Sequence, residues 1–258
     1  MANKEQLREL ENGVERWNQW RSDHPDVIID LSHTKLIGWM LSGANLAQAN
    51  LEGTDLSGAS LHQANLTEAN LKGTQCLGAD LSEATLHGTN LEAANLSRVD
   101  AQNSNFQFSC LQGAALTGAE LAHACFEGAN LQAAKLDRVD LSHAQLMQAQ
   151  LQGASLSASR LMYANLTGAN LQGVNLTETK LNRSNLSQVD FTDAILDSTN
   201  FLGANLTGAV FTGADVRRAN LSGATLEAAN LPELPPEEEL EAQSPEECAQ
   251  AALDDLMA

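Results

Sequence analysis

The sequence predicts an all-β solenoid, a tube of short extended segments that are joined by corners. An apolar residue stands at every fifth position from Leu31 to Leu231, in unbroken register, and 33 of these 41 residues are leucine. The residue two places earlier is small except at Ile29 and Trp39, and it is alanine in 25 of the 41 cases. A period of five fits neither the 3.6 of a helix nor the 2 of a long strand. It fits an extended segment followed by a turn.

Positions in each repeat are numbered here from the central apolar residue, as −2, −1, 0, +1 and +2. Strand alternation directs positions −2 and 0 to the same side, which is the interior of the tube. Glycine marks the corner, because 17 of the 18 glycines fall at position +2 and only Gly13 does not. All five prolines lie outside the repeat, so none removes a backbone donor from the ladder. The centres that are not leucine are Cys76, Ala101, Phe106, Phe126, Phe191, Phe201, Phe211 and Val216.

These residues, as in SGANLAQANLEGTDLSGASL at 42–61, resemble the pentapeptide-repeat family, whose pattern is A(D/N)LXX. The resemblance covers residues 29–231. It implies a right-handed, quadrilateral parallel β-helix with one repeat on each of four sides, and hence about ten coils. At ~4.8 Å per coil the rod is about 48 Å long. Gyrase-protecting members of the family often carry projecting loops, for which the unbroken register leaves no room.

Residues 1–28 are expected to form an N-terminal capping helix and a lead-in to the tube. Asn3 and Gln6 resemble a capping box, which places a helix at about 4–21. We expect Trp17, Trp20 and Trp39 to cluster under this helix as a hydrophobic plug, because solenoids need covered ends. The alternative is that the tryptophans form a ligand site. The apolar residues assigned to this cap are Leu7, Leu10, Val14, Trp17, Trp20 and Trp39.

Residues 232–258 are expected to form an acidic, Pro- and Glu-rich linker and a short C-terminal helix at 245–257. Ser244, Pro245 and Glu247 are typical of a helix start. Ala249, Leu253 and Leu256 then form a narrow apolar stripe. The helix either covers the last coil or joins two chains, as the C-terminal ends of gyrase-protecting family members do. A monomer and a homodimer through this helix are both compatible with the sequence.

One side of the tube carries the richest chemistry, because residues twenty apart stack into ladders along it. Stacked carboxylates are expected to raise each other's pKa values and to favour cations or a basic partner. The alternative is a solvated outer wall. His123 and His143 have no evident third ligand, so no metal site is expected. The candidate partner-binding residues are Asp80, Glu83, Asp100, Glu120, His123, Asp140, His143, Arg160, Tyr163, Lys180 and Arg183.

The stretch 99–110 departs furthest from the repeat. Ala101 leaves a gap at a centre, and Arg98, Asn103 and Phe108 stand where glycine is common. Phe106, on the next side of the same coil, is large enough to fill that gap. We expect a repacked core layer here, and a bend in the rod is the alternative.

Composition argues against most enzymatic and membrane functions. The four cysteines have no paired spacing, no signal peptide is evident, and no run of eighteen apolar residues occurs, which favours a reduced, cytoplasmic setting. No motif for a phosphate, zinc or other cofactor is present, and a convex, leucine-filled tube offers no pocket for catalysis. We therefore predict a protein that is not an enzyme and that has neither a cofactor nor a membrane anchor.

Charge helps to choose between two functions. The net charge is −19, which argues against direct binding to nucleic acid. Residues 31–231 carry ten basic and seventeen acidic groups, whereas residues 232–258 carry nine acidic and no basic groups. Duplex DNA would present about 28 charges over the same length. The sequence therefore favours a non-catalytic scaffold for an unknown protein partner. A DNA mimic that binds a type II topoisomerase (gyrase), as the resemblance permits, is the alternative.

Overall fold

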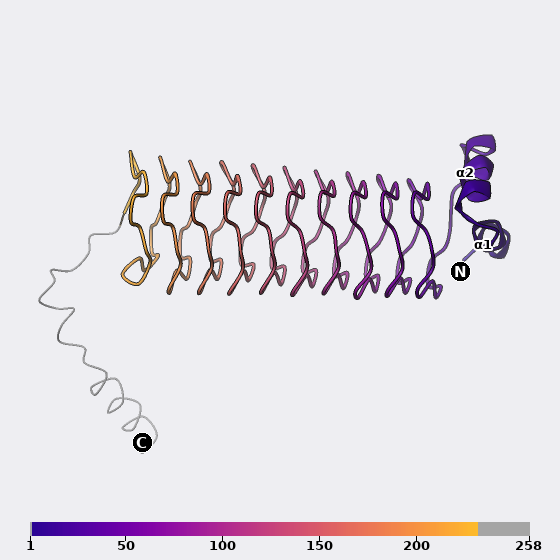
Figure 1. Ribbon diagram of the computed structural model, residues 1–258, viewed down its shortest axis with the longest axis horizontal. Coiled ribbons are helices and arrows are strands. Elements are labelled where there is room, and N and C mark those ends of the chain that lie inside the picture. Colours follow the sequence, from indigo (N-terminus) through magenta and orange to yellow (C-terminus); the bar gives the residue numbers. More distant parts are fainter. Residues whose placement is uncertain (1, 232–258) are drawn as a thin grey trace, which may run out of the picture.

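The computed structural model describes residues 2–231, which form a four-sided right-handed β-helix with two helices at its N-terminal end (Figure 1). Helices α1 (Lys4–Glu11) and α2 (Val14–Asp23) lie beside the first coil, and the coils stack in one row along the long axis. Every extended segment is a single parallel bridge at position −1. The bridges join residues twenty apart, from Asp30–Asn50 to Val210–Asn230. One coil is therefore four repeats, which confirms the predicted fold.

Backbone hydrogen bonds between and within coils satisfy four of the five N–H groups in a typical repeat. Position 0 donates to position −1 of the next coil, as Leu31 does to Asn50 (2.8 Å), and position −1 donates back, as Asn50 does to Ile29 (2.8 Å). Position +2 also donates to the next coil, and position −2 closes the turn to the preceding centre. The N–H of position +1 is left over and needs a side-chain acceptor.

The side chain at position −1 provides that acceptor. Asn45 Oδ1 accepts from the N–H of Ala47 (3.2 Å), and Asp55 Oδ1 accepts from that of Ser57 (3.1 Å). Only a short side chain with an oxygen at the γ carbon reaches a backbone group two residues on in this way. The preference for Asn or Asp in the repeat therefore has a local cause, and it does not require a charge.

The interior is a continuous column of buried side chains from positions −2 and 0. Among the aromatic residues, Phe106 stacks on Phe126 with 4.7 Å between ring centroids. Except for the partly buried Thr34, Thr or Ser at position −2 is buried with its hydroxyl bonded to a core carbonyl, as when Thr54 donates to Leu31 (2.8 Å). Small polar residues are thus tolerated in the core because their hydroxyls find acceptors.

The irregular stretch 99–110 does not interrupt the ladder. Asp100 bridges to Glu120, and Asn105 bridges to Cys125, in the common register. Ala101 and Phe106 are both fully buried. The backbone therefore passes through this stretch as a repacked layer of the same rod.

Position +2 adopts a left-handed backbone whether or not it is glycine. Seventeen glycines and 22 other residues have a positive φ there, and Arg218 is the exception between 33 and 228. Phe108 is one of the 22, with φ 57°, and its ring lies over Gly128 of the next coil. A Cβ on Gly128 would stand 2.7 Å from two ring carbons of Phe108. Glycine at 128 thus serves two needs, the left-handed corner and the space for the ring.

We expect Gly128→Ala to destabilise the rod by about 1–2 kcal/mol for the left-handed backbone, with a further loss from the collision with Phe108. In a Phe108→Ala background, only the backbone part of this cost should remain. A double-mutant cycle measured by urea unfolding separates the two parts. An equal cost in both backgrounds would contradict the contact between the ring and Gly128.

The predicted single helix at 4–21 is wrong, because the chain forms two helices that break at Asn12 and Gly13. Gly13 has φ 102°, which lies outside the helical region. The capping box also forms only in part. Asn3 accepts from the N–H groups of Glu5 (2.9 Å) and Gln6 (3.3 Å). The Gln6 side chain is buried, and it bonds Ile28 O and Asp30 N (both 2.8 Å), so it ties α1 to the first coil.

Trp17 closes the N-terminal end of the tube. Its side chain is fully buried, and its Nε1 donates to Asn45 O (2.9 Å). Trp17 stacks on Trp20 with 5.4 Å between centroids, and Trp20 in turn stacks on His24. Leu10 is buried as well, and the partly buried residues that pack against the core here are Leu7, Val14, Trp20 and Trp39. The helix expected at 245–257, with Ala249, Leu253 and Leu256, lies outside the described residues.

Candidate functional site

One side of the rod has charged residues at position −1 in six consecutive coils, and we call it the charged face. The other three sides have four, two and no charged residues at this position. Parallel bridges connect the six residues in order along the rod axis. They are Asp80, Asp100, Glu120, Asp140, Arg160 and Lys180. The structure therefore brings these predicted site residues into one ladder.

Three of the acids in this ladder have the local structural role that Asn has elsewhere. Asp80 accepts from Ser82 N (3.0 Å), Asp100 from Gln102 N (3.1 Å) and Asp140 from Ser142 N (2.9 Å). An Asn at the same position makes the same bond, as Asn45 does to Ala47. The backbone thus needs the oxygen but not the charge.

The other three residues of the ladder extend further from the backbone. Glu120, Arg160 and Lys180 are exposed. Arg160 Nη1 lies 3.6 Å from Asp140 Oδ2, and its side chain is 60% exposed. Their longer side chains carry the charges outwards, where a partner has access to them.

The pKa of Asp140 is lowered, whereas the stacked carboxyls were expected from the sequence to have raised pKa values. Partial burial alone would raise this pKa. The backbone N–H of Ser142, its nearby hydroxyl and the positive charge of Arg160 together outweigh burial and hold the pKa below its usual range. For Asp140 the neighbouring cation and the turn decide the direction, so the expectation is wrong there.

A second ladder runs along the adjacent corner at position +2. His123 and His143 stack with 4.8 Å between ring centroids and an 8° interplanar angle, and His143 stacks on Tyr163 at 5.0 Å and 8°. Arg183 Nη1 donates to Tyr163 Oη (3.1 Å). The faces of these rings contact one another, so their edges are left for a partner.

The acidic end of this corner is formed by Glu83, whose Oε2 accepts from Gln63 Nε2 (2.8 Å). Moving towards the C-terminus, the corner passes from Glu83 through the two histidines and Tyr163 to Arg183. Both ladders therefore change from acidic to basic in the same direction.

Within residues 2–231, no group of three or more His, Cys, Asp or Glu residues is placed to hold a metal ion. The cysteines of this part of the chain are free, and burial raises the pKa of the Cys76 thiol to about 12. Cys110 and Cys125 are half-buried on the outer wall. No helix among the described residues is long and apolar enough to cross a membrane.

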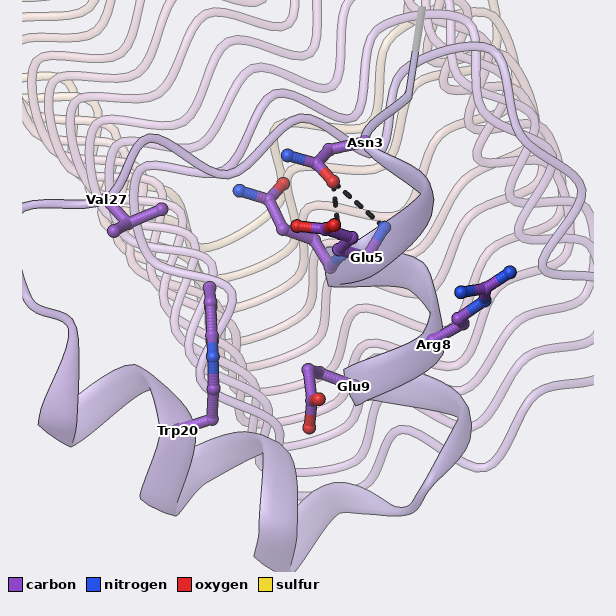
Figure 2. A pocket seen from close by; sticks show the side chains of 7 residues that line it. Asn3, Glu5, Arg8, Glu9, Trp20 and Val27 are labelled. Atoms are coloured by element: carbon purple, nitrogen blue, oxygen red, sulfur yellow. Dashed lines mark hydrogen bonds between the residues drawn. The ribbon is translucent and has the colours of Figure 1, made fainter.

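A hollow of about 460 Å³ lies between α1, α2 and the lead-in to the first coil (Figure 2). It was not predicted from the sequence. Trp20 projects into it from α2, and Asn3 stands at its edge with its oxygen bonded to the first turn of α1. The break between the helices creates this hollow, and Gly13 was its only signal in the sequence. Its lining residues are Asn3, Glu5, Gln6, Arg8, Glu9, Trp20 and Val27.

A family model described as pentapeptide repeats matches this chain in eight copies that together span 29–73 and 79–223. The chain belongs to the pentapeptide-repeat family. No curated protein matches it significantly.

Several solved structures of pentapeptide-repeat proteins are similar to this chain. HetL, described as involved in heterocyst differentiation regulation from the cyanobacterium Nostoc sp. strain PCC 7120, is 31% identical over 90% of this chain and 98% of its own, with a TM-score of 0.49. QnrB1, a plasmid-mediated fluoroquinolone resistance protein, is 21% identical over 57% of this chain and 79% of its own, with a TM-score of 0.27. Rfr23 from the cyanobacterium Cyanothece 51142 is 24% identical over 62% and 88%, with a TM-score of 0.21.

Proposed function

We propose that this protein is a non-catalytic interaction scaffold, a rigid rod that binds another protein through its charged face. The observation that carries the proposal is the run of six consecutive charged residues at position −1. Asn satisfies the backbone equally well there, so the charges exceed what the fold needs. Like charges in neighbouring coils repel one another, and a partner of complementary charge would relieve that repulsion on binding.

The corner ladder supports the same proposal. His123, His143 and Tyr163 adopt φ values of 60–62°, a left-handed conformation that costs an L-residue about 1–2 kcal/mol. Stacking of the rings offsets part of this strain, because each aromatic pair stabilises the rod by about 0.5–1.5 kcal/mol. The polar ring edges beside charged groups are suited to hydrogen bonding with a protein partner.

Charge order argues against imitation of DNA. A DNA mimic needs negative charge along its whole length, whereas this face ends in Arg160 and Lys180, and the adjacent corner ends in Arg183. A partner surface with basic groups opposite the acids and acidic groups opposite the bases fits the face better.

The test replaces Asp80, Asp100, Glu120 and Asp140 together by Asn and compares affinity capture from the source cell with that of the wild-type protein. We expect the main captured partner to be lost or to bind at least about tenfold more weakly, most of all at low salt, because exposed charges are least screened there.

The matched control replaces four acids on other sides and corners of the rod, Glu52, Glu92, Glu127 and Asp193, by Gln or Asn, and capture should persist. A supercoiling assay with gyrase runs in parallel. Equal capture by both variants would overturn the assignment of the face, and inhibition or protection of gyrase would support the DNA mimic instead.

A further inference from the structure

The charge order along the charged face is complementary to itself. Four acids are followed by two bases, and the change occurs between Asp140 and Arg160. When two such faces meet with their rods antiparallel, a two-fold axis at this change places Asp140 against Arg160 of the second copy. The same axis places Glu120 against Lys180 of the second copy. Symmetry makes each of these pairs occur twice, as in any isologous interface.

We propose that the charged face binds a second copy of this chain in antiparallel orientation, with the two-fold axis between the coils of Asp140 and Arg160. The proposal rests on the function proposed above and names the partner of that same face. Residues of successive coils lie about one coil apart, as the centroid distances of 4.8 and 5.0 Å between the stacked rings show. Four ion pairs therefore form side by side along the centre of the face.

This register is the only central one without a clash of like charges. If one rod slides along the other by one coil, so that the two-fold axis moves half a coil towards the N-terminus, Asp140 comes to lie against Asp140 of the second copy. If the rod slides by one coil in the other direction, Arg160 comes to lie against Arg160 of the second copy. Parallel rods would place every charged residue against its own copy. Electrostatic complementarity therefore selects both the orientation and the register.

The two corners beside the charged face are compatible with the same antiparallel arrangement. At position +2, the axis brings His143 opposite Tyr163, and His123 opposite Arg183, of the second copy. Position +1 of this side holds no Asp, Glu, Lys or Arg in any coil. On the other corner, Arg138 comes opposite Ala158 and Glu178 opposite Gly118. No like charges oppose each other at either corner.

Charge reversal and its compensation provide the test. Glu120→Lys sets a lysine against Lys180 of the second copy, twice in each dimer. Sedimentation velocity over a concentration series, at one fixed ionic strength, should show self-association weakened by at least about tenfold. Lys180→Glu should weaken it equally. The combined variant Glu120→Lys/Lys180→Glu restores the pairing and should recover wild-type association.

The matched control is Glu127→Lys, at a corner that does not border the charged face, and it should associate like the wild-type protein. A protein that is monomeric at all concentrations, or a dimer indifferent to both single reversals, would overturn the proposal. Failure of the combined variant to recover association would do so too. If the wild-type protein is monomeric yet the four-Asn variant loses a captured partner, the scaffold function stands and only the second copy is wrong.

Discussion

Leu136→Asp is expected to destabilise the protein by roughly 4–5 kcal/mol or more, because it places an unpaired charge in the core. Leu136 is a fully buried centre in the middle of the rod. The neighbouring centres of its side, Leu116 and Leu156, are also fully buried, so no water reaches the carboxylate. Because stability in a solenoid is close to a sum over coils and their interfaces, a failed central coil separates the two halves.

Urea unfolding monitored by circular dichroism measures this loss, and Leu136→Met is the control. Methionine conserves volume and polarity, so its cost should stay below about 1.5 kcal/mol. A Leu136→Asp protein with an unchanged unfolding midpoint would contradict the inward orientation of position 0.

Trp17→Ala should have the second largest effect, a loss of about 3–5 kcal/mol. Trp17 is fully buried, stacks on Trp20 and bonds Asn45 O through its indole N–H. Its removal opens the N-terminal end of the core and leaves that carbonyl without its donor.

The location of this loss distinguishes a cap from a general core residue. Hydrogen exchange should accelerate at the N–H groups of Leu36 and Leu41, in the first coil, and should change little beyond Leu136. Trp20→Ala is the control, because Trp20 is only partly buried and should cost less. Uniform acceleration along the rod would show that Trp17 does not act as a local cap.

The tube could be predicted from the sequence because its period is enforced in every repeat. Leucine at position 0 and alanine at position −2 fix which side chains face inwards, and a single slipped residue would turn all later centres outwards. The number of sides did not follow from the period of five. It required the family resemblance, and the bridges between residues twenty apart now show it directly.

The N-terminal cap was predicted less well, because its residues have the spacing of one continuous helix but form two helices that pack on the first coil. Leu7, Leu10, Val14 and Trp17 have helical spacing. The chain nevertheless breaks at Asn12, which caps the end of α1, and at Gly13, which caps the start of α2. Gln6 has the spacing of a capping residue, but the first coil offers its side chain two backbone partners. Tertiary contacts override the local pattern at both places.

The charged ladder was visible in the sequence once residues twenty apart were aligned, but the electrostatics of Asp140 were not. The turn bond from Ser142 and the approach of Arg160 depend on side-chain placement within a coil and between coils. The stacking of His123, His143 and Tyr163 likewise depends on their shared left-handed backbone, which the spacing alone did not indicate.

The thermal stability of the variant with Asp80, Asp100, Glu120 and Asp140 all replaced by Asn tests most directly whether the charges of this face exceed what the fold needs. Asn keeps the turn bond that Asp80, Asp100 and Asp140 make. The substitutions also remove the repulsion between neighbouring acids, which offsets the loss of the exposed ion pair between Asp140 and Arg160. We therefore predict an unchanged or slightly raised Tm. For a protein of this size a loss of 1 kcal/mol lowers Tm by roughly 2–4 °C. A fall of about 5 °C or more would show that the carboxylates stabilise the rod itself, and would contradict the account.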